Sequence, residues 1–192
     1  MSDVRRLDSA GAADLVALVE VFDELQVVLQ CCERLVADLA ADSESDPIVL
    51  EAVWTTALLC YARCFASDSR APVLTEQDLT GIHPEGDVLG WHHALLSLRD
   101  HYAHRTDNPR ERVSVGVALA NGAAGGVAIT AARQPQFDDV IVRQTGAIAF
   151  GLSGLVNDRI EALQKQVFSD VRDSPAAELE KLVAIDVADE LP

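Results

Sequence analysis

The residues best suited to chemistry are histidines and arginines gathered in one part of the chain. All five histidines fall within 22 residues: His83, His92, His93, His101 and His104. Four arginines lie among or just after the last of them: Arg99, Arg105, Arg110 and Arg112. Imidazole titrates near neutral pH and guanidinium binds phosphate through a fixed fork of donors. This segment therefore combines the means for proton transfer with the means for phosphate recognition.

The net charge of the whole chain contrasts with the charge of this segment. The 192 residues include 15 Lys and Arg against 31 Asp and Glu, so the formal net charge is −16. From Arg99 to Arg112, four arginines and three acids leave one positive charge. Such acidity excludes a protein that coats DNA or RNA, because coating requires a broad basic face. It leaves room for one narrow cleft that accepts a phosphate.

A short motif stands inside the histidine-rich segment. Arg99 is followed directly by Asp100, and His104 lies five positions after Arg99, near the end of a predicted helix. This pattern resembles the signature of the HEPN family (higher eukaryotes and prokaryotes nucleotide-binding domains), which is Arg, then Asn, Asp or His, then three residues and His. In sequence the resemblance rests on about six residues, and in architecture it extends over residues 12–168.

The resemblance implies a metal-independent endoribonuclease of a toxin–antitoxin or anti-phage defence system. It implies that Arg99 holds the scissile phosphate, that His104 is the general acid or base for attack by the ribose 2′-hydroxyl, and that Asp100 orients its neighbours. The implied partners are an RNA substrate, a second copy of the chain and a cognate antitoxin or defence protein, with no cofactor. Family members silenced by nucleotide transfer carry a tyrosine where this chain has Thr106.

Four further residues are candidates for contacting the substrate. They are His92, two helical turns before Arg99, Arg63 on the preceding helix, and His101 and Arg105 beside the motif. Each has a structural alternative, since basic side chains favour helix C-termini, histidines occur as satisfied core groups and arginines extend from apolar surroundings to water. Two other functions stay open: a non-catalytic helical module for dimerisation or protein interaction, and a regulatory domain that binds a nucleotide.

The cysteines and histidines do not have the spacing of a metal site. The pairs His101/His104 and Cys60/Cys64 match neither a zinc finger nor a His-Glu-x-x-His metallohydrolase, so we predict no metal. The four cysteines, Cys31, Cys32, Cys60 and Cys64, follow no export signal and are expected to be reduced thiols in a cytoplasmic protein. The charge-free run over 113–132 contains four glycines and alternates like strands, so we do not expect it to span a membrane.

The helical elements follow from local patterns. Apolar residues recur at steps of three and four from Leu15 through Leu18, Phe22, Leu25, Leu29, Cys32 and Val36 to Leu39, which predicts a helix of roughly 30 residues. The dipeptide Asp46-Pro47 predicts the start of a second helix reaching about residue 68. The segment from Thr75 to Asp78 predicts a capped turn. A third main helix is expected from about residue 87 to the Asn-Pro pair at 108–109.

The later elements include a change of period. Alternating apolar residues on both sides of Asn121-Gly122 predict a β-hairpin over 112–132, and we expect helices or a partner chain to cover it. A last long helix is predicted over 138–168, where Gly146, Gly151 and Gly154 would let another helix approach closely. Residues 169–192 form an acidic tail with a short helix at about 175–184. The sequence thus predicts a mainly α fold, a bundle of four to five helices over residues 1–168, with the hairpin between the third and fourth main helices.

Overall fold

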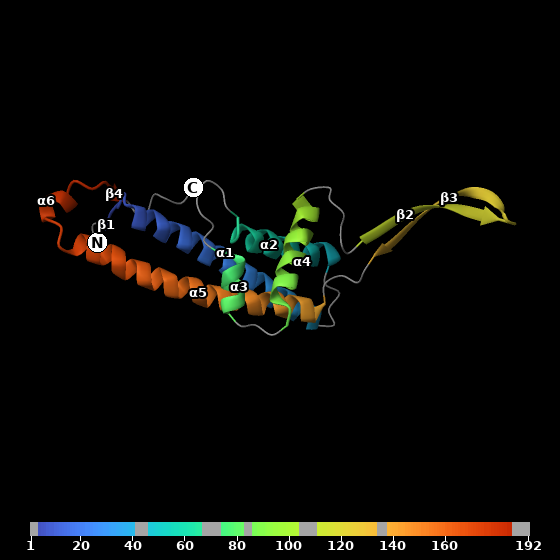
Figure 1. Ribbon diagram of the computed structural model, residues 1–192, viewed down its shortest axis with the longest axis horizontal. Helices are drawn as coiled ribbons and strands as arrows, with labels where there is room; N and C mark the ends of the chain where they lie inside the picture. The colour runs from blue at the N-terminus through green and yellow to red at the C-terminus, as the bar shows by residue number, and fades with distance from the viewer. Residues whose placement is uncertain are drawn as a thin grey trace.

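The computed structural model of the chain describes residues 4–40, 46–66, 74–82, 86–103, 111–133 and 138–185. The elements, in chain order, are β1 (Val4–Arg5), α1 (Ala10–Ala40), α2 (Pro47–Arg63), α3 (Glu76–Gly81), α4 (Val88–Ala103), β2 (Glu111–Ala120), β3 (Ala123–Arg133), α5 (Asp139–Arg172), α6 (Ala176–Leu179) and β4 (Ala184–Ile185). The fold is a mainly α helical bundle with a β-hairpin between α4 and α5, as predicted (Figure 1).

The two longest helices form the backbone of the bundle. At 1.5 Å per residue, α1 and α5 are each about 50 Å long, and they run side by side in opposite directions (Figure 1). The most buried positions of α1 are Val21, Leu25, Val28, Cys32 and Leu35. Of the apolar residues predicted to form the buried side of this helix, most are half-buried, and the last one, Leu39, is exposed. The buried side of α1 is wider than one stripe because α2 and α5 both pack against it.

Glycines in α5 bring its backbone close to other elements. A Cβ built on Gly146 would lie 3.4 Å from Cys32 Cβ on α1, and one on Gly151 would lie 3.1 Å from Ile82 Cδ1. A Cβ on Gly154 would meet nothing within 4 Å. The predicted approach of another helix is therefore confirmed at Gly146 and wrong at Gly154. Gly151 is approached by Ile82, the residue that follows α3.

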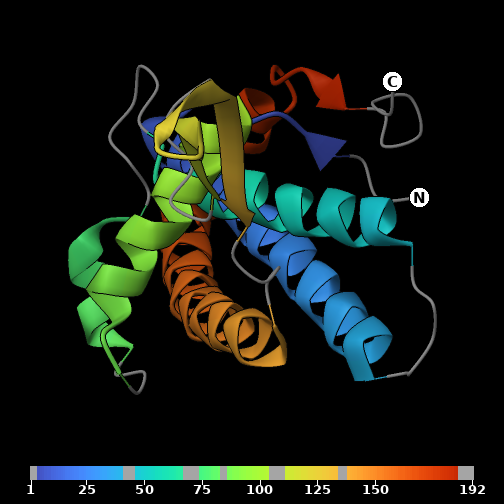
Figure 2. The ribbon, with the colours of Figure 1, turned by 90° about the vertical axis from the view of Figure 1, so that its right-hand side faces the viewer.

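The middle helices begin at the predicted capping residues. The Asp46 carboxylate accepts a hydrogen bond from the backbone N–H of Ile48 at 2.9 Å, with proline as the first residue of α2. This helix ends at Arg63, earlier than predicted. The predicted turn after Thr75 is the helix α3, and the Asp78 carboxylate accepts the backbone N–H of Thr75 at 2.8 Å. Figure 2 shows that α2 lies across α1, and that α3 lies beside α5.

The hairpin between α4 and α5 leaves the bundle at one end and extends away from the helices (Figure 1). Strands β2 and β3 are antiparallel, and both turn residues have positive φ, 51° at Asn121 and 81° at Gly122. These angles match the type I′ turn that an Asn-Gly pair favours. The hairpin is thus confirmed, but its large apolar residues are exposed, so the helices in the described ranges do not cover it.

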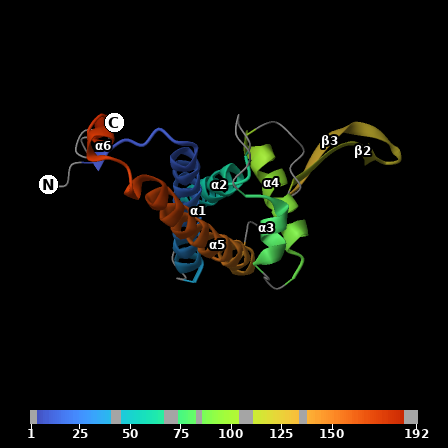
Figure 3. The ribbon, with the colours of Figure 1, turned by 60° about the vertical axis from the view of Figure 1, so that its left-hand side comes forward.

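At the opposite end of the bundle, near α6, the two ends of the described chain meet (Figure 3). Val4 pairs with Ile185 and Arg5 with Ala184 in the antiparallel sheet of β1 and β4. The prediction of a helix over 175–184 is therefore wrong in its second half, because backbone pairing with β1 holds Ala184 in extended conformation. The predicted start of the tail, residue 169, lies inside α5. Within the described residues, no helix combines the length and apolar sequence that crossing a bilayer requires.

Candidate functional site

Helix α4 carries most of the predicted site, and its neighbour α2 sets its surroundings. The two helices run antiparallel, because Tyr61 near the end of α2 contacts His92 near the start of α4, while Tyr102 at the end of α4 donates to Glu51 near the start of α2 at 2.5 Å. The motif residue Arg99 lies in the second half of α4, toward the Tyr102 end.

Arg99 and Asp100 lie in contact near the C-terminal end of α4. The Arg99 Nε and Asp100 Oδ1 atoms are 2.8 Å apart, and the two side chains are 33% and 47% exposed. Although the pair is close, Arg99 Nε is buried and makes no well-aligned hydrogen bond within the described residues. A short distance with poor alignment gives an ion pair but only a weak hydrogen bond. The guanidinium is therefore held in place without satisfying its inner N–H.

His92 lies in the core. Its side chain is 2% exposed, its Nδ1 shares a hydrogen bond with the Tyr61 hydroxyl at 2.9 Å, and the Phe65 ring centroid lies 4.5 Å from its own. Burial, followed by the nearby His93, lowers the pKa of His92. Burial also raises the pKa of Tyr61, so both rings are neutral around pH 7. Against the sequence-based prediction of a substrate contact, His92 is thus a satisfied core histidine.

The next residue, His93, points the other way. Its side chain is 59% exposed, and its Nε2 lies 2.9 Å from the Glu76 carboxylate on α3. The hydrogen bond from His93 lowers the pKa of Glu76. Consecutive residues on one helix therefore have opposite roles, one inside the core and one in a surface pair that joins α4 to α3.

Arg63 lies away from the motif. It is the last residue of α2, near the His92 end of α4. Its Nη1 lies 3.1 Å from Glu24 Oε1 on α1, and its side chain is 65% exposed. The predicted role in substrate binding is therefore not supported by proximity, because this arginine pairs with a different helix at the other end of the α2–α4 contact.

The remaining predicted residues lie at or beyond the end of α4. His101 is half-buried, and its ring centroid is 5.7 Å from that of Tyr102. His104 and Arg105 lie outside the described residues. The structure thus brings together Arg99 and Asp100, and His101 is the next residue along α4. Sequence reasoning missed Tyr61 as the partner of His92, because no spacing within either helix shows that these two faces meet.

The cysteines are free thiols, as expected. Cys32, Cys60 and Cys64 are buried and Cys31 is half-buried. Burial, as the largest cause, raises the pKa of each of the three buried thiols to about 12. These thiols stay protonated at neutral pH and are poor nucleophiles. Among the described residues, no group of three or more His, Cys, Asp or Glu side chains is placed to hold a metal ion.

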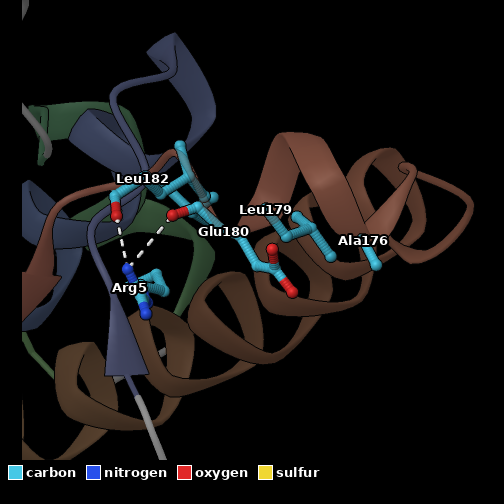
Figure 4. Close-up of a pocket in the computed structure, with 6 residues that line it drawn as sticks. Arg5, Ala176, Leu179, Glu180 and Leu182 are labelled. Carbon is cyan, nitrogen blue, oxygen red and sulfur yellow. Dashed lines mark hydrogen bonds between the residues drawn. The ribbon is translucent and has the colours of Figure 1, made fainter.

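Two surface pockets lie away from the motif. One, of about 390 Å³, is lined by Arg5, Leu7, Ala176, Leu179, Glu180 and Leu182. There the Arg5 guanidinium donates to the main-chain oxygens of Glu180 and Leu182 at 3.2 and 3.0 Å, which fastens β1 to the segment after α6 (Figure 4). The other, of about 520 Å³, lies between α3 and α5, where Arg159 is ion-paired with Asp78. In both pockets the arginine already has partners in the chain.

The best candidate for chemistry is therefore the Arg99–Asp100 pair, a half-exposed ion pair next to a histidine-rich segment. The position near the C-terminus of α4 stabilises the positive charge of Arg99. The buried Nε–H of Arg99 can still donate a hydrogen bond to an acceptor. Comparison of the chain with protein-family models, with curated proteins and with solved structures finds no match.

Proposed function

We propose that the C-terminal end of α4 belongs to a metal-independent endoribonuclease site formed by Arg99, Asp100 and His104. The observation that supports the proposal is the state of Arg99, one third exposed and with a buried Nε–H that lacks a well-aligned acceptor. Turning this side chain toward a phosphate oxygen loses no hydrogen bond at Nε and forms charge-assisted ones. Asp100 holds the guanidinium until the phosphate arrives.

The proposed reaction is an internal transfer at phosphorus. The ribose 2′-oxygen attacks phosphorus, the bond from phosphorus to the 5′-oxygen breaks, and the products are a 2′,3′-cyclic phosphate and a free 5′-hydroxyl. The proton of the 2′-hydroxyl passes to an imidazole, and the leaving 5′-oxygen takes a proton from another acid. One imidazole cannot accept and donate in the same step, so His104 acts together with the equivalent histidine of a second copy.

The acidity of the chain limits how RNA is bound. With a net charge of −16, the bundle repels the phosphate backbone except beside the arginines of the motif segment. Contact with RNA is then short, and broad binding to duplexes is not expected. A nuclease of this kind suits a toxin–antitoxin or anti-phage defence system, in which a partner protein holds it inactive.

The test is cleavage of end-labelled RNA by the purified chain in EDTA. The wild type is compared with Arg99→Ala and His104→Ala, and we expect either change to lower the cleavage rate by about 100-fold or more. The matched control is Arg143→Ala, which removes another arginine that is paired with a neighbouring acid, Asp139, on a helix. This control is expected to cleave like the wild type, and the products should carry cyclic phosphates.

The nuclease proposal fails if no RNA is cleaved, or if the motif variants cleave as fast as the control. A specific observation, the uncovered apolar hairpin, then favours a non-catalytic assembly module as the second candidate function. In that case a second copy should bind equally well to the wild type and to Arg99→Ala.

A further inference from the structure

The hairpin carries one large apolar face that the helices leave open. Register pairs Val115 with Ile129 and Val117 with Val127 on this face. The six large side chains, Val113, Val115, Val117, Leu119, Val127 and Ile129, are between 62% and 75% exposed. We call these six residues the arm face. Antiparallel sheets that face water normally carry polar side chains on the wet side, so this face is built to be covered.

The opposite face of the hairpin differs in kind. Its cross-strand pairs are Ser114 with Thr130, Gly116 with Ala128, and Ala118 with Gly126. These residues are small or polar and can remain in water at little cost. The hairpin therefore has one face that is unfavourable in water without a partner. The large side chains of that face are exposed, so no helix of the described chain shields them.

We propose that the arm face packs against the same face of a second copy of this chain. Residues 113–132 hold no charged side chain, in a chain whose net charge is −16. The arm face therefore offers nothing to attract a basic or acidic partner, and it lies in the longest charge-free run of the sequence, where contact between two copies brings no like charges face to face. An apolar face whose side chains are exposed can pack against the same face of a second copy under twofold symmetry.

The apolar area of the arm face is large enough for an interface between two copies of the chain. Covering a Val, Leu or Ile side chain removes on the order of 100 Å² from water, so six per copy give roughly 600 Å². Two copies together then bury about 1,200 Å², which is at the lower end of the range for specific stable interfaces. The pairing rests on the arm alone and does not depend on RNA cleavage.

The experiment measures the mass of the full chain in solution by light scattering and sedimentation over a range of concentrations. We expect the wild type to reach about twice the 20.6 kDa of one chain. The double variant Val115→Lys/Ile129→Lys places two charges on the arm face and is expected to raise the dimer Kd by about 100-fold or more. The matched control is Ser114→Lys/Thr130→Lys, the neighbouring cross-strand pair with the same added charge on the opposite face. This control is expected to stay dimeric.

Helical circular dichroism checks that each variant keeps the bundle. The proposal is overturned if the wild type is monomeric throughout, if Val115→Lys/Ile129→Lys remains dimeric, or if the control dissociates as much as the arm-face variant. A monomeric wild type that binds phosphatidylcholine vesicles through the arm face would also overturn it, because the occupant would then be a lipid surface. Loss of the dimer with RNA cleavage unchanged would support this inference and overturn the two-copy site of the proposed function. A dimeric wild type that cleaves no RNA would overturn the proposed function alone.

Discussion

At the scale of single residues, burial and partners matter more than residue type. His92 and His93 are consecutive imidazoles, yet one is sealed beside Tyr61 and the other pairs with Glu76 at the surface. Arg99 and Arg63 are likewise both basic and differ in their ion-pair partners. Arg99 pairs with Asp100 on its own helix, and Arg63 pairs with Glu24 on α1. A candidate site is therefore defined by the neighbours of each side chain rather than by the cluster in sequence.

The lowered pKa of buried His92 predicts a loss of stability in mild acid. As pH falls below the ordinary histidine value of 6.5, the unfolded chain takes up a proton that the folded His92 resists, so the free energy of unfolding decreases. The slope reaches at most about 1.4 kcal/mol per pH unit, the limit for one proton. Urea unfolding between pH 7.5 and 5 should show this slope reduced in His92→Gln.

The exposed neighbour supplies the control for that measurement. His93→Gln makes the same change at a side chain that is 59% exposed, so it measures what losing an imidazole from α4 does outside the core. The paired carboxylate of Glu76 does not interfere, since its lowered pKa affects stability only as pH falls through values below 4.5. An unchanged slope in His92→Gln would show that His92 is not the group that resists protonation.

At the scale of elements, helices and strands form where local patterns place them, while their contacts set the fine detail. The Asp46 and Asp138 carboxylates cap α2 and α5 at 2.9 Å from backbone N–H groups, and Asn121-Gly122 turns the hairpin. What local patterns do not set is which side of a helix is most buried. On α4 that side runs through Val88, His92, Leu95 and Leu98, so that Trp91 is only half-buried beside it.

Two glycines of α5 give a matched test of packing against helix propensity. Gly154→Ala adds a methyl group in open space and should raise the free energy of unfolding by up to about 1 kcal/mol, because alanine favours the helix. Gly151→Ala makes the same change 3.1 Å from Ile82 Cδ1 and should gain less or lose stability. Chemical denaturation compares the two, and equal gains would mean that Ile82 moves aside freely.

At the scale of the whole molecule, an acidic bundle carries at one end a hairpin that has no charged residue over 113–132 (Figure 1). The bundle buries its apolar side chains from all four longer helices, and the hairpin leaves its own in water. This separation of charge from apolar surface is the basis of the proposal that two copies associate through the arm face.

The charge distribution predicts that salt strengthens the proposed dimer. Two chains of charge −16 repel each other, and raising NaCl from about 0.01 M to about 0.15 M shortens the screening length from about 30 to about 8 Å. Sedimentation should therefore show the dimer Kd falling several-fold over this range. A Kd that rises with salt would indicate that ion pairs, rather than the arm face, hold the copies together.

The sequence by itself determined the type and order of the main helices and of the hairpin, and the position of the chemical residues along them, but not the sheet of β1 and β4. Caps, the 3.6-residue and 2-residue periods and the Asn-Gly turn are local, so they act before any tertiary contact forms. The helix predicted over 175–184 is too long, because the interaction that opposes it, the pairing of Ala184 with Arg5, involves a residue from the far end of the chain.

The tertiary structure alone decided which of the described candidate residues lie close together. It placed His92 against Tyr61, joined Arg63 to Glu24 and left the Arg99–Asp100 pair half-exposed near the end of α4. It also decided that the hairpin is uncovered. Each outcome depends on which helix lies beside which, and such contacts join residues tens of positions apart, where no spacing within one segment records them.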